Sequence, residues 1–583
     1  MKDYNMLWRG FFGRRYDAVS TGDSSKKQKE AAQKKVQKYR NHKCVERRRA
    51  LTYALLGIGA LISGLFIHLV DPYTLLYQWK IQFGPGGEIF GLWERPPVEL
   101  FLKVYLWNIT NSEEYMTGKA DKLKFEEVGP YVYRELMTHE NITFNDNGTL
   151  TSIPNHPLVW EPHLSGERRE DDLLILPNIA LLSIADVVSK QNLFTRLGLN
   201  VIIRRTNSQP LVKMTAKEFM FGYKSALMNL GNTFMPSWIY FDKLGLIDRM
   251  YEFRGDYETV YTGTKHGLTN IGLIDTYNGE SKIPQWDSPC GDIQGASDAT
   301  KFPGYIQPND TLVFYRKSMC RAKTLVHVND TVKDGFKAYV YHFADDEDDN
   351  GRIHEKNRCF CKESNIDQCK PRGLLDVRGC YYGFPIALSY PHFLDADKVL
   401  FDKVESGLNP DPEKHRSEFV IEPKSGMPVN VAVRMQINMA LGNIQNIANS
   451  EKFSNIVLPM LWMEIGMYGL PTSLKIRFKL YLEIVPTAQE CLKYALLIIA
   501  PLALIYSVHK LICSRGSSAQ ENDCPWIEDA FVLNIDRKLS SYIPEKRPSL
   551  THKEFDAYMN TFLAPVHHHV IDRPMATFIR EDD

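Results

Sequence analysis

The sequence lacks the short motifs that mark the common enzyme active sites. It contains no GxSxG nucleophile elbow, no HExxH zinc motif, no P-loop and no Gly-rich dinucleotide turn. It also lacks an excess of charge of either sign, because 70 Lys and Arg balance 70 Asp and Glu. Composition therefore indicates no nucleic-acid partner. Missing motifs do not exclude an enzyme, but they favour binding and transport, and we expect no catalytic residues and no cofactor.

Two long apolar segments are present, at Ala50–Val70 and Leu492–Cys513. Each has about the twenty residues that a helix needs to cross a bilayer. Residues 1–49 carry fifteen Lys and Arg against five Asp and Glu, and a positive flank of this kind holds the N-terminus in the cytosol. A cleaved signal peptide is the alternative for the first segment. The long basic lead and the missing small-residue cleavage site argue against it.

These features predict a two-pass membrane protein with both termini in the cytosol. We expect a basic tail at 1–49, spans at 50–70 and 491–513, an ectodomain at 71–490 and a second tail at 514–583. All N-glycosylation sequons fall between the spans, which supports this topology. The sequons are at Asn108, Asn141, Asn147, Asn309 and Asn329.

Six of the ten cysteines lie in one part of the predicted ectodomain. An even number of cysteines in an oxidising compartment predicts three disulfides, for which fifteen pairings are open. The neighbours Cys359 and Cys361 should have different partners. A zinc site is disfavoured because paired CxxC units are missing. The six cysteines are Cys290, Cys320, Cys359, Cys361, Cys369 and Cys380.

The ectodomain is predicted to be mainly β. Val429–Met439 alternates apolar and polar residues, which predicts a strand with one buried face, and Val98–Trp107 also favours a strand. Two helical segments interrupt this pattern. Asn178–Leu197 has helical spacing and ends at Gly198, and a capping box at Thr215–Glu218 begins a second helix that stops at Gly231.

A helical subdomain at 178–231 therefore interrupts the sheet. Four basic residues lie in or beside the connection between its helices, and they are candidates for a ligand-facing patch. An ordinary solvated face is the alternative. The four residues are Arg196, Arg204, Arg205 and Lys213.

The predicted tails hold short candidate signals. Tyr4 with Leu7, and Tyr16 with Val19, fit the tyrosine-x-x-apolar pattern that clathrin adaptors bind. Cys44 and Cys513 lie at the membrane edges and are candidates for palmitoylation. No metal site is predicted, since the acidic run at 345–349 lacks the spaced ligands of a calcium loop and suits a solvated loop better.

Several longer strings are distinctive, beginning with EVGPYVYRE at Glu127–Glu135. This string resembles the GPYxYR signature of the class B scavenger receptor family, which includes the fatty-acid translocase, lysosomal integral membrane and sensory neuron membrane proteins. The chain is thereby identified as a member of that family. The resemblance extends over about residues 50–515. Further matching strings are at Leu176–Ala180, Ile274–Gly279, Phe360–Cys380, Pro385–Asp397, Gly407–His415 and Ile421–Met439.

The resemblance implies a structure for the ectodomain. Members have an antiparallel β-barrel core with an internal apolar tunnel and a helical-bundle apex, which corresponds here to 178–231. The family pattern implies disulfides joining Cys290 to Cys359, Cys320 to Cys380, and Cys361 to Cys369. The cargo-facing role of Arg204 and Arg205 is also favoured by this correspondence.

The resemblance also implies a function. We expect a scavenger receptor that binds lipoprotein, lipid or other extracellular or luminal ligands at the apex, transfers lipid through the tunnel and is taken up by endocytosis. The alternative is a sorting receptor for protein cargo without lipid transport. A two-pass ion channel is disfavoured because the second span offers few polar residues to line a pore. We expect the plasma membrane, the endosome-lysosome membrane or both, with clathrin adaptors at the tails; a homo-oligomer is compatible with the sequence.

Overall fold

The computed structural model describes residues 23–85, 87–225, 227, 229 and 243–515. Two compact units divide the chain. One comprises Met1–Ser63 with Ala495–Asp583, and the other comprises Gly64–Tyr494. The larger unit contains all strands of the described residues, and the smaller contains most of the two long helices α1 (Asp23–Val70) and α12 (Val485–Arg515).

A twelve-stranded sheet forms the centre of the larger unit. Its main path runs β12-β13-β14-β18-β19-β20-β1-β2-β17. These strands are β12 (Leu312–Arg316), β13 (Arg321–Lys333), β14 (Phe336–Phe343), β18 (Glu418–Glu422), β19 (Met427–Ala440), β20 (Val457–Met467), β1 (Leu100–Ile109), β2 (Leu123–Glu135) and β17 (Val404–Ser406). Off this path are β5 (Leu158–Trp160), β15 (Leu375–Asp376) and β16 (Ile386–Ser389).

The sheet is almost entirely antiparallel, with one parallel pair, β17 and β2. No backbone ladder joins the terminal strands β12 and β17 within the described residues, so the ladder is open rather than closed into a barrel. The predicted mainly β ectodomain is confirmed. The predicted antiparallel barrel is corrected to an open sheet with one parallel edge pair.

Strand β19 forms as its alternation predicts, but its polar face is also covered. Gln436 and Asn438 are both fully buried. Asn438 Nδ2 donates to Ser389 Oγ at 3.0 Å, and the main-chain N–H of His392 donates to Gln436 Oε1 at 2.9 Å. The prediction of one buried face is therefore wrong over this half of β19, because β16 and the turn after it pack on the second face and satisfy its amides.

Smaller sheets complete the unit. A four-stranded sheet has the order β11-β10-β4-β3, and two strand pairs stand apart from it. The four strands are β11 (Ile274–Tyr277), β10 (Glu258–Tyr261), β4 (Thr149–Asn155) and β3 (Thr138–Phe144). The pairs are β6 (Leu173–Pro177) with β7 (Leu211–Thr215), and β8 (Tyr223–Lys224) with β9 (Lys243–Leu244).

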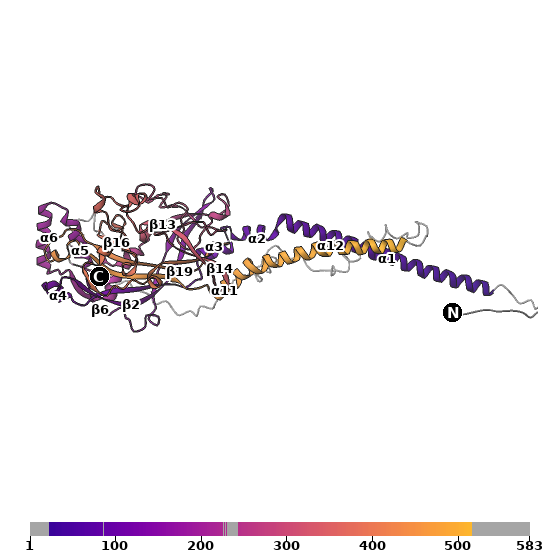
Figure 1. Ribbon diagram of the computed structural model, residues 1–583, viewed down its shortest axis with the longest axis horizontal. Helices are drawn as coiled ribbons and strands as arrows, with labels where there is room; N and C mark the ends of the chain where they lie inside the picture. Colours follow the sequence, from indigo (N-terminus) through magenta and orange to yellow (C-terminus); the bar gives the residue numbers. More distant parts are fainter. Residues whose placement is uncertain (1–22, 86, 226, 228, 230–242, 516–583) are drawn as a thin grey trace, which may run out of the picture. The chain divides into compact units, whose positions relative to one another are not determined.

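Helices gather at the two ends of the main sheet. Figure 1 shows α5 and α6 at one end, and α2, α3 and α11 at the other, where the chain continues into the long helices. The helices are α2 (Pro72–Ile81), α3 (Glu88–Glu94), α4 (Ser112–Thr117), α5 (Ile179–Ser189), α6 (Leu193–Thr206), α7 (Ala216–Phe221), α9 (Leu246–Met250), α10 (Pro412–His415) and α11 (Thr472–Lys479), and a π-helical turn at Leu480–Ile484 joins α11 to α12. Short 3-10 turns occur at Leu268–Asn270, Lys317–Met319, Glu355–Phe360, Ile366–Gln368, Arg378–Cys380, Pro391–Phe393, Lys398–Phe401 and Glu451–Phe453.

The helical segment after residue 178 differs from the prediction in its boundaries. It is two helices, because Asn192 begins α6 by accepting a hydrogen bond from the Thr195 N–H at 3.0 Å. Gly198 lies inside α6, which ends at Asn207 in a left-handed conformation with φ 49°. The capping box of Thr215 and Glu218 is confirmed. Helix α7 ends before Gly222 with φ 109°, and the predicted stop at 231 lies outside the described residues.

Both predicted spans lie inside long helices that are apolar enough to cross a bilayer. These regions are Cys44–Val70 and Thr472–Cys513. Within the smaller unit the two helices touch through small and polar residues. Ser507 Oγ donates to the Ala50 carbonyl at 2.7 Å, and a Cβ placed on Gly57 would lie 2.9 Å from Leu504 Cγ. Glycine at this position therefore allows close helix contact, as expected where lipid removes the hydrophobic drive for association.

Candidate functional site

The larger unit contains an apolar cavity of about 130 Å³, within about 1360 Å³ of unfilled space that includes open solvent. Its wall draws on α3, α11 and both halves of the main sheet, so it lies where the sheet and these helices meet. The apolar lining includes Phe83, Ile89, Leu92, Trp93, Val98, Leu100, Ile274, Phe314, Val431, Val433, Ile465, Met467, Leu470 and Leu474. The apolar lining suits a largely apolar ligand.

One side of the cavity is closed by a buried ion pair. Glu135, at the end of β2, accepts hydrogen bonds from Arg316 of β12 at 3.1 Å, from Tyr251 at 2.8 Å, and pairs with His156 at 2.7 Å. Strands β2 and β12 lie near opposite ends of the strand order. The sheet must therefore curl, so that side chains join its two ends where no backbone ladder does.

The carboxylate of Glu135 is held in its charged form. Burial raises its pKa, but Arg316, His156 and Tyr251 outweigh burial and lower the pKa to about 2. A carboxyl group with a lowered pKa stabilises the fold above the unfolded pKa of 4.5, and this stability is lost as the pH falls from 4.5 towards 2. The pair therefore persists at mildly acidic pH.

Lys301 is a buried cation in the wall of the cavity. Among the described residues, no carboxylate is in ion-pair contact with it. Its Nζ donates to the Phe302 carbonyl at 2.6 Å. Burial lowers its pKa to about 7, although Glu422 raises it. Near neutral pH the lysine is thus divided between its charged and neutral forms.

A second polar cluster adjoins the cavity and has the ligand types of a metal site. His139, Glu258 and Asp298 each offer one ligand atom, and these atoms lie within 4.8 Å of one another. Burial lowers the pKa of His139, but Glu258 and Asp298 outweigh it, and the pKa is raised above its ordinary value. The sequence did not reveal this cluster, because its members are about 40 to 160 positions apart in the chain.

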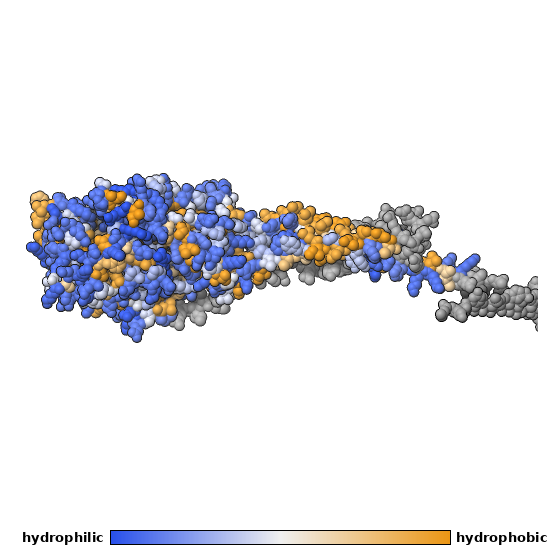
Figure 2. All heavy atoms as spheres, viewed as in Figure 1, coloured by the Kyte–Doolittle hydropathy of each residue, from blue (hydrophilic) through white to orange (hydrophobic). Residues whose placement is uncertain are grey.

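Helix α6 exposes an apolar face with two arginines at its end. An α-helix turns about 100° per residue. On α6 the exposed apolar side chains of Leu193, Phe194, Leu197 and Val201 therefore share an arc of about 120° with the two arginines Arg204 and Arg205. Figure 2 shows an orange patch at the end of the unit where Figure 1 places α6. The exposed fractions are 57% for Leu193, 83% for Phe194, 51% for Leu197 and 65% for Val201.

The four predicted basic residues do not form one patch, because they lie on different faces of α6 and on strand β7. Arg204 and Arg205 lie in the last turn of α6 and are exposed. Arg196 is half-buried and lies about 60° outside the exposed arc, with its Nε buried and without a hydrogen-bond partner. Lys213 is exposed on β7, opposite Ile175. Only Arg204 and Arg205 therefore accompany the apolar face.

Comparison with known proteins assigns the family. The sequence profile of the CD36 family matches residues 53–511. The chain belongs to the CD36 family. It is 31% identical over 476 residues to scavenger receptor class B member 1 of Mus musculus, covering 80% of this chain and 90% of that protein. It is 28% identical to lysosome membrane protein 2 of Rattus norvegicus, covering 71% of this chain and 84% of that protein. It is 26% identical to protein peste of Drosophila melanogaster, covering 71% of this chain and 74% of that protein.

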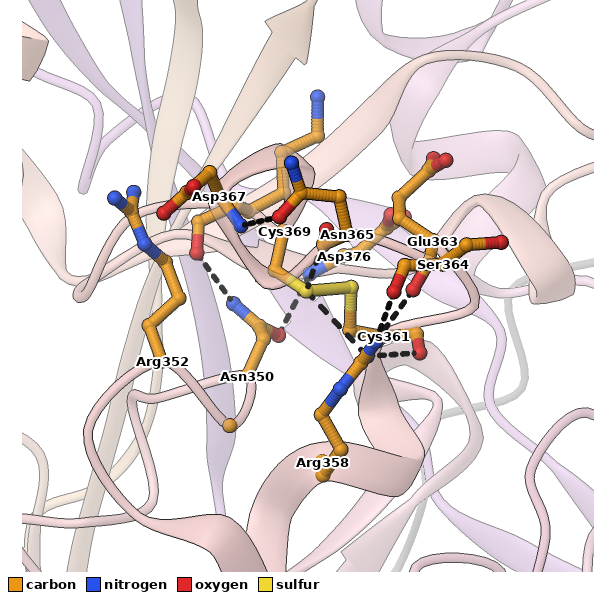
Figure 3. The surroundings of a disulfide bond; sticks show 12 residues. Asn350, Arg352, Arg358, Cys361, Glu363, Ser364, Asn365, Asp367, Cys369 and Asp376 are labelled. Carbon is orange, nitrogen blue, oxygen red and sulfur yellow. Dashed lines mark hydrogen bonds between the residues drawn. A yellow bond between two sulfur atoms is a disulfide. The ribbon is translucent and has the colours of Figure 1, made fainter.

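Membership of the CD36 family identifies the chain as a membrane-embedded receptor and not an enzyme. In the structure three disulfides join Cys290 to Cys359, Cys320 to Cys380 and Cys361 to Cys369, the pairs that the resemblance implies. Figure 3 shows the last of these closing a short loop around Arg358. The Arg358 guanidinium donates to the Cys361 and Glu363 carbonyls at 2.7 and 2.5 Å.

The remaining predicted sites differ in accessibility. Among the sequons, the side chain of Asn108 is half-buried, donates to Glu126 at 3.0 Å and accepts from the Ile175 N–H at 3.0 Å. A glycan there would have to displace the bond to Glu126. The other four sequon asparagines, Asn141, Asn147, Asn309 and Asn329, are exposed. Of the two palmitoylation candidates, Cys513 is exposed and Cys44 is half-buried, and the sorting candidates Tyr4, Leu7, Tyr16 and Val19 lie outside the described residues.

We expect Glu135→Gln to lower the free energy of unfolding by about 3–5 kcal/mol, because it leaves Arg316 buried without a countercharge. The matched control is Glu161→Gln, which removes the partly exposed ion pair with Arg134 and should cost about 1 kcal/mol or less. Chemical denaturation of the full-length protein in nanodiscs measures both. Equal losses would show that the buried pair does not hold the sheet.

We expect Lys301→Met to stabilise the protein at pH 6 by about 2–4 kcal/mol, because methionine removes the cost of burying the charge. A base with a lowered pKa costs stability fully below its folded pKa, and the cost disappears as the pH rises from about 7 to 10.5. The advantage of the variant should therefore shrink at pH 10. The exposed Lys337→Met is the control in the same denaturation series, and a gain independent of pH would contradict the assignment.

Proposed function

We propose that this protein is a class B scavenger receptor that binds lipoprotein, lipid or other extracellular or luminal ligands on the α6 end of the ectodomain and transfers lipid through the cavity. The observation that carries the proposal is the apolar cavity inside the ectodomain of a CD36-family chain. Burying one methylene group stabilises by about 0.8 kcal/mol, so an acyl chain or sterol would enter such a space without chemistry.

The α6 face supports ligand docking at the other end of the sheet. Exposing Phe194 and its apolar neighbours to water is unfavourable in the free protein, and exposed apolar faces of this kind mark interaction sites. Arg204 and Arg205 would attract anionic groups on the ligand surface. Together they favour a ligand that offers both apolar and negatively charged surface, as a lipoprotein particle does.

The proposal extends to topology and trafficking. Both termini are cytosolic, in the tails 1–49 and 514–583, and the ectodomain is extracellular or luminal. The four exposed sequon asparagines between the spans support this orientation. Tyr4 and Tyr16 would recruit clathrin adaptors for endocytosis, and the receptor would reside at the plasma membrane, in endosomes and lysosomes, or in both.

The lipid step is tested by filling the cavity. Val98→Trp places a large side chain in the lining, and the adjacent, exposed Glu99→Trp is its matched control. We expect Val98→Trp to reduce uptake of a fluorescent sterol or fatty acid from lipoprotein particles several-fold in cells, with particle binding unchanged. Unchanged lipid uptake would sink the transfer step and leave the alternative, a sorting receptor for protein cargo.

The docking step is tested by reversing charge. Arg204→Glu with Arg205→Glu should weaken binding of lipoprotein particles about tenfold and reduce its salt dependence. Arg168→Glu with Arg169→Glu reverses another exposed arginine pair and is the matched control. Both double variants are compared by surface plasmon resonance on full-length receptor in nanodiscs. Equal effects of the two would show that α6 is not the docking element.

A further inference from the structure

The cluster of His139, Glu258 and Asp298 brings three segments together beside the cavity. His139 is on β3, Glu258 is on β10, and Asp298 precedes β12. Strand β4 lies between β3 and β10, with Pro154 opposite His139 and Ser152 opposite Glu258. Since Ser152 and Pro154 are two residues apart, His139 and Glu258 share one face of the sheet.

The imidazole of His139 is oriented for metal binding. Its Nδ1 lies 2.9 Å from the Trp93 carbonyl oxygen, which can only accept, so Nδ1 carries the proton. In the neutral form of the ring, the lone pair that can bind a metal ion is therefore on Nε2. A backbone carbonyl that holds the other ring nitrogen is the usual outer partner of a metal-bound histidine. Trp93 also stacks on the ring, with centroids 3.7 Å apart, which fixes its plane.

The polar atoms around Nε2 lack the hydrogen bonds that burial demands. Nε2 is fully buried and 3.3 Å from Glu258 Oε1, but has no hydrogen-bond partner. The buried hydroxyl of Ser152 is also unpartnered, whereas Asp298 Oδ1 accepts hydrogen bonds from the Thr300 N–H and hydroxyl. Leaving buried polar atoms unsatisfied is costly, so this arrangement favours binding of a cation.

The neighbouring positive side chains are already committed. Arg316 pairs with Glu135 at 3.1 Å, and Lys317 pairs with Asp256. Lys301 donates to the Phe302 carbonyl. None of these cations is in ion-pair contact with Glu258 or Asp298 among the residues that the structure describes. A bound divalent cation would balance both carboxylates.

We propose that His139, Glu258 and Asp298 bind a divalent metal ion of the zinc class. One imidazole nitrogen with two carboxylates is a ligand set that Zn²⁺ accepts, and Ser152 or water would complete it. Ligand atoms at about 2.0–2.1 Å from a tetrahedral ion lie about 3.4 Å apart, as Nε2 and Glu258 Oε1 do at 3.3 Å. Closing the third ligand onto the ion would fasten β3, β10 and the Asp298 loop beside Trp93, which lines the cavity.

The test measures zinc in the full-length protein purified in nanodiscs without a polyhistidine tag. His567, His568 and His569 are replaced by alanine in every sample, so that this run cannot bind zinc. After chelation and reloading with Zn²⁺, we expect about one zinc per chain by mass spectrometry and a rise in melting temperature.

The variants His139→Gln, Glu258→Gln and Asp298→Asn should each weaken zinc binding at least about tenfold and abolish the thermal shift. Asp298 is in a partly exposed loop, so its variant remains informative if the buried variants fold poorly. His163→Gln, an exposed histidine, is the control and should keep the metal. No zinc above background, or zinc unaffected by the three substitutions, overturns the proposal and leaves a protonated His139 paired with Glu258.

Discussion

The ion pair between Glu135 and Arg316 is the contact on which the ectodomain depends. It joins strands from near opposite ends of an open sheet, 181 positions apart in the chain, and it does so beside the cavity. A closed barrel would satisfy its edges by backbone hydrogen bonds. Here a fully satisfied buried carboxylate performs the closure. The price of such a pair is desolvation, which only its three partners together offset.

This closure explains how an apolar cavity can persist in a well-packed protein. The sheet curls far enough to enclose space, and the charges on its wall are largely tied to one another, so few polar groups compete for a ligand. Three wall side chains are exceptions among the described residues: Lys301 has no carboxylate in ion-pair contact, and Glu258 and Asp298 have no Lys or Arg in such contact. A wall of this kind selects by shape and apolar area.

The two ends of the larger unit carry different helices and different exposed side chains. At one end α6 presents apolar side chains and two arginines to the outside, and at the other end α2, α3 and α11 surround the connections to the spans. In the smaller unit Gly57 and Ser507 let the two spans pack closely. The exposed face of α6 and the helices α2, α3 and α11 therefore lie at opposite ends of the larger unit of this CD36-family chain.

The sequence by itself determined the features that depend on local pattern. Length and hydropathy predicted the spans, alternation predicted β19, and the Thr215–Glu218 capping box predicted the start of α7. Tertiary structure decided what depends on neighbours: Gln436 and Asn438 are buried because β16 covers them, and α6 continues through Gly198 to a cap at Asn207. It also decided which distant side chains meet. The pairing of Glu135 with Arg316, the cavity they close and the His139 cluster follow from the curl of the sheet, which no local pattern records.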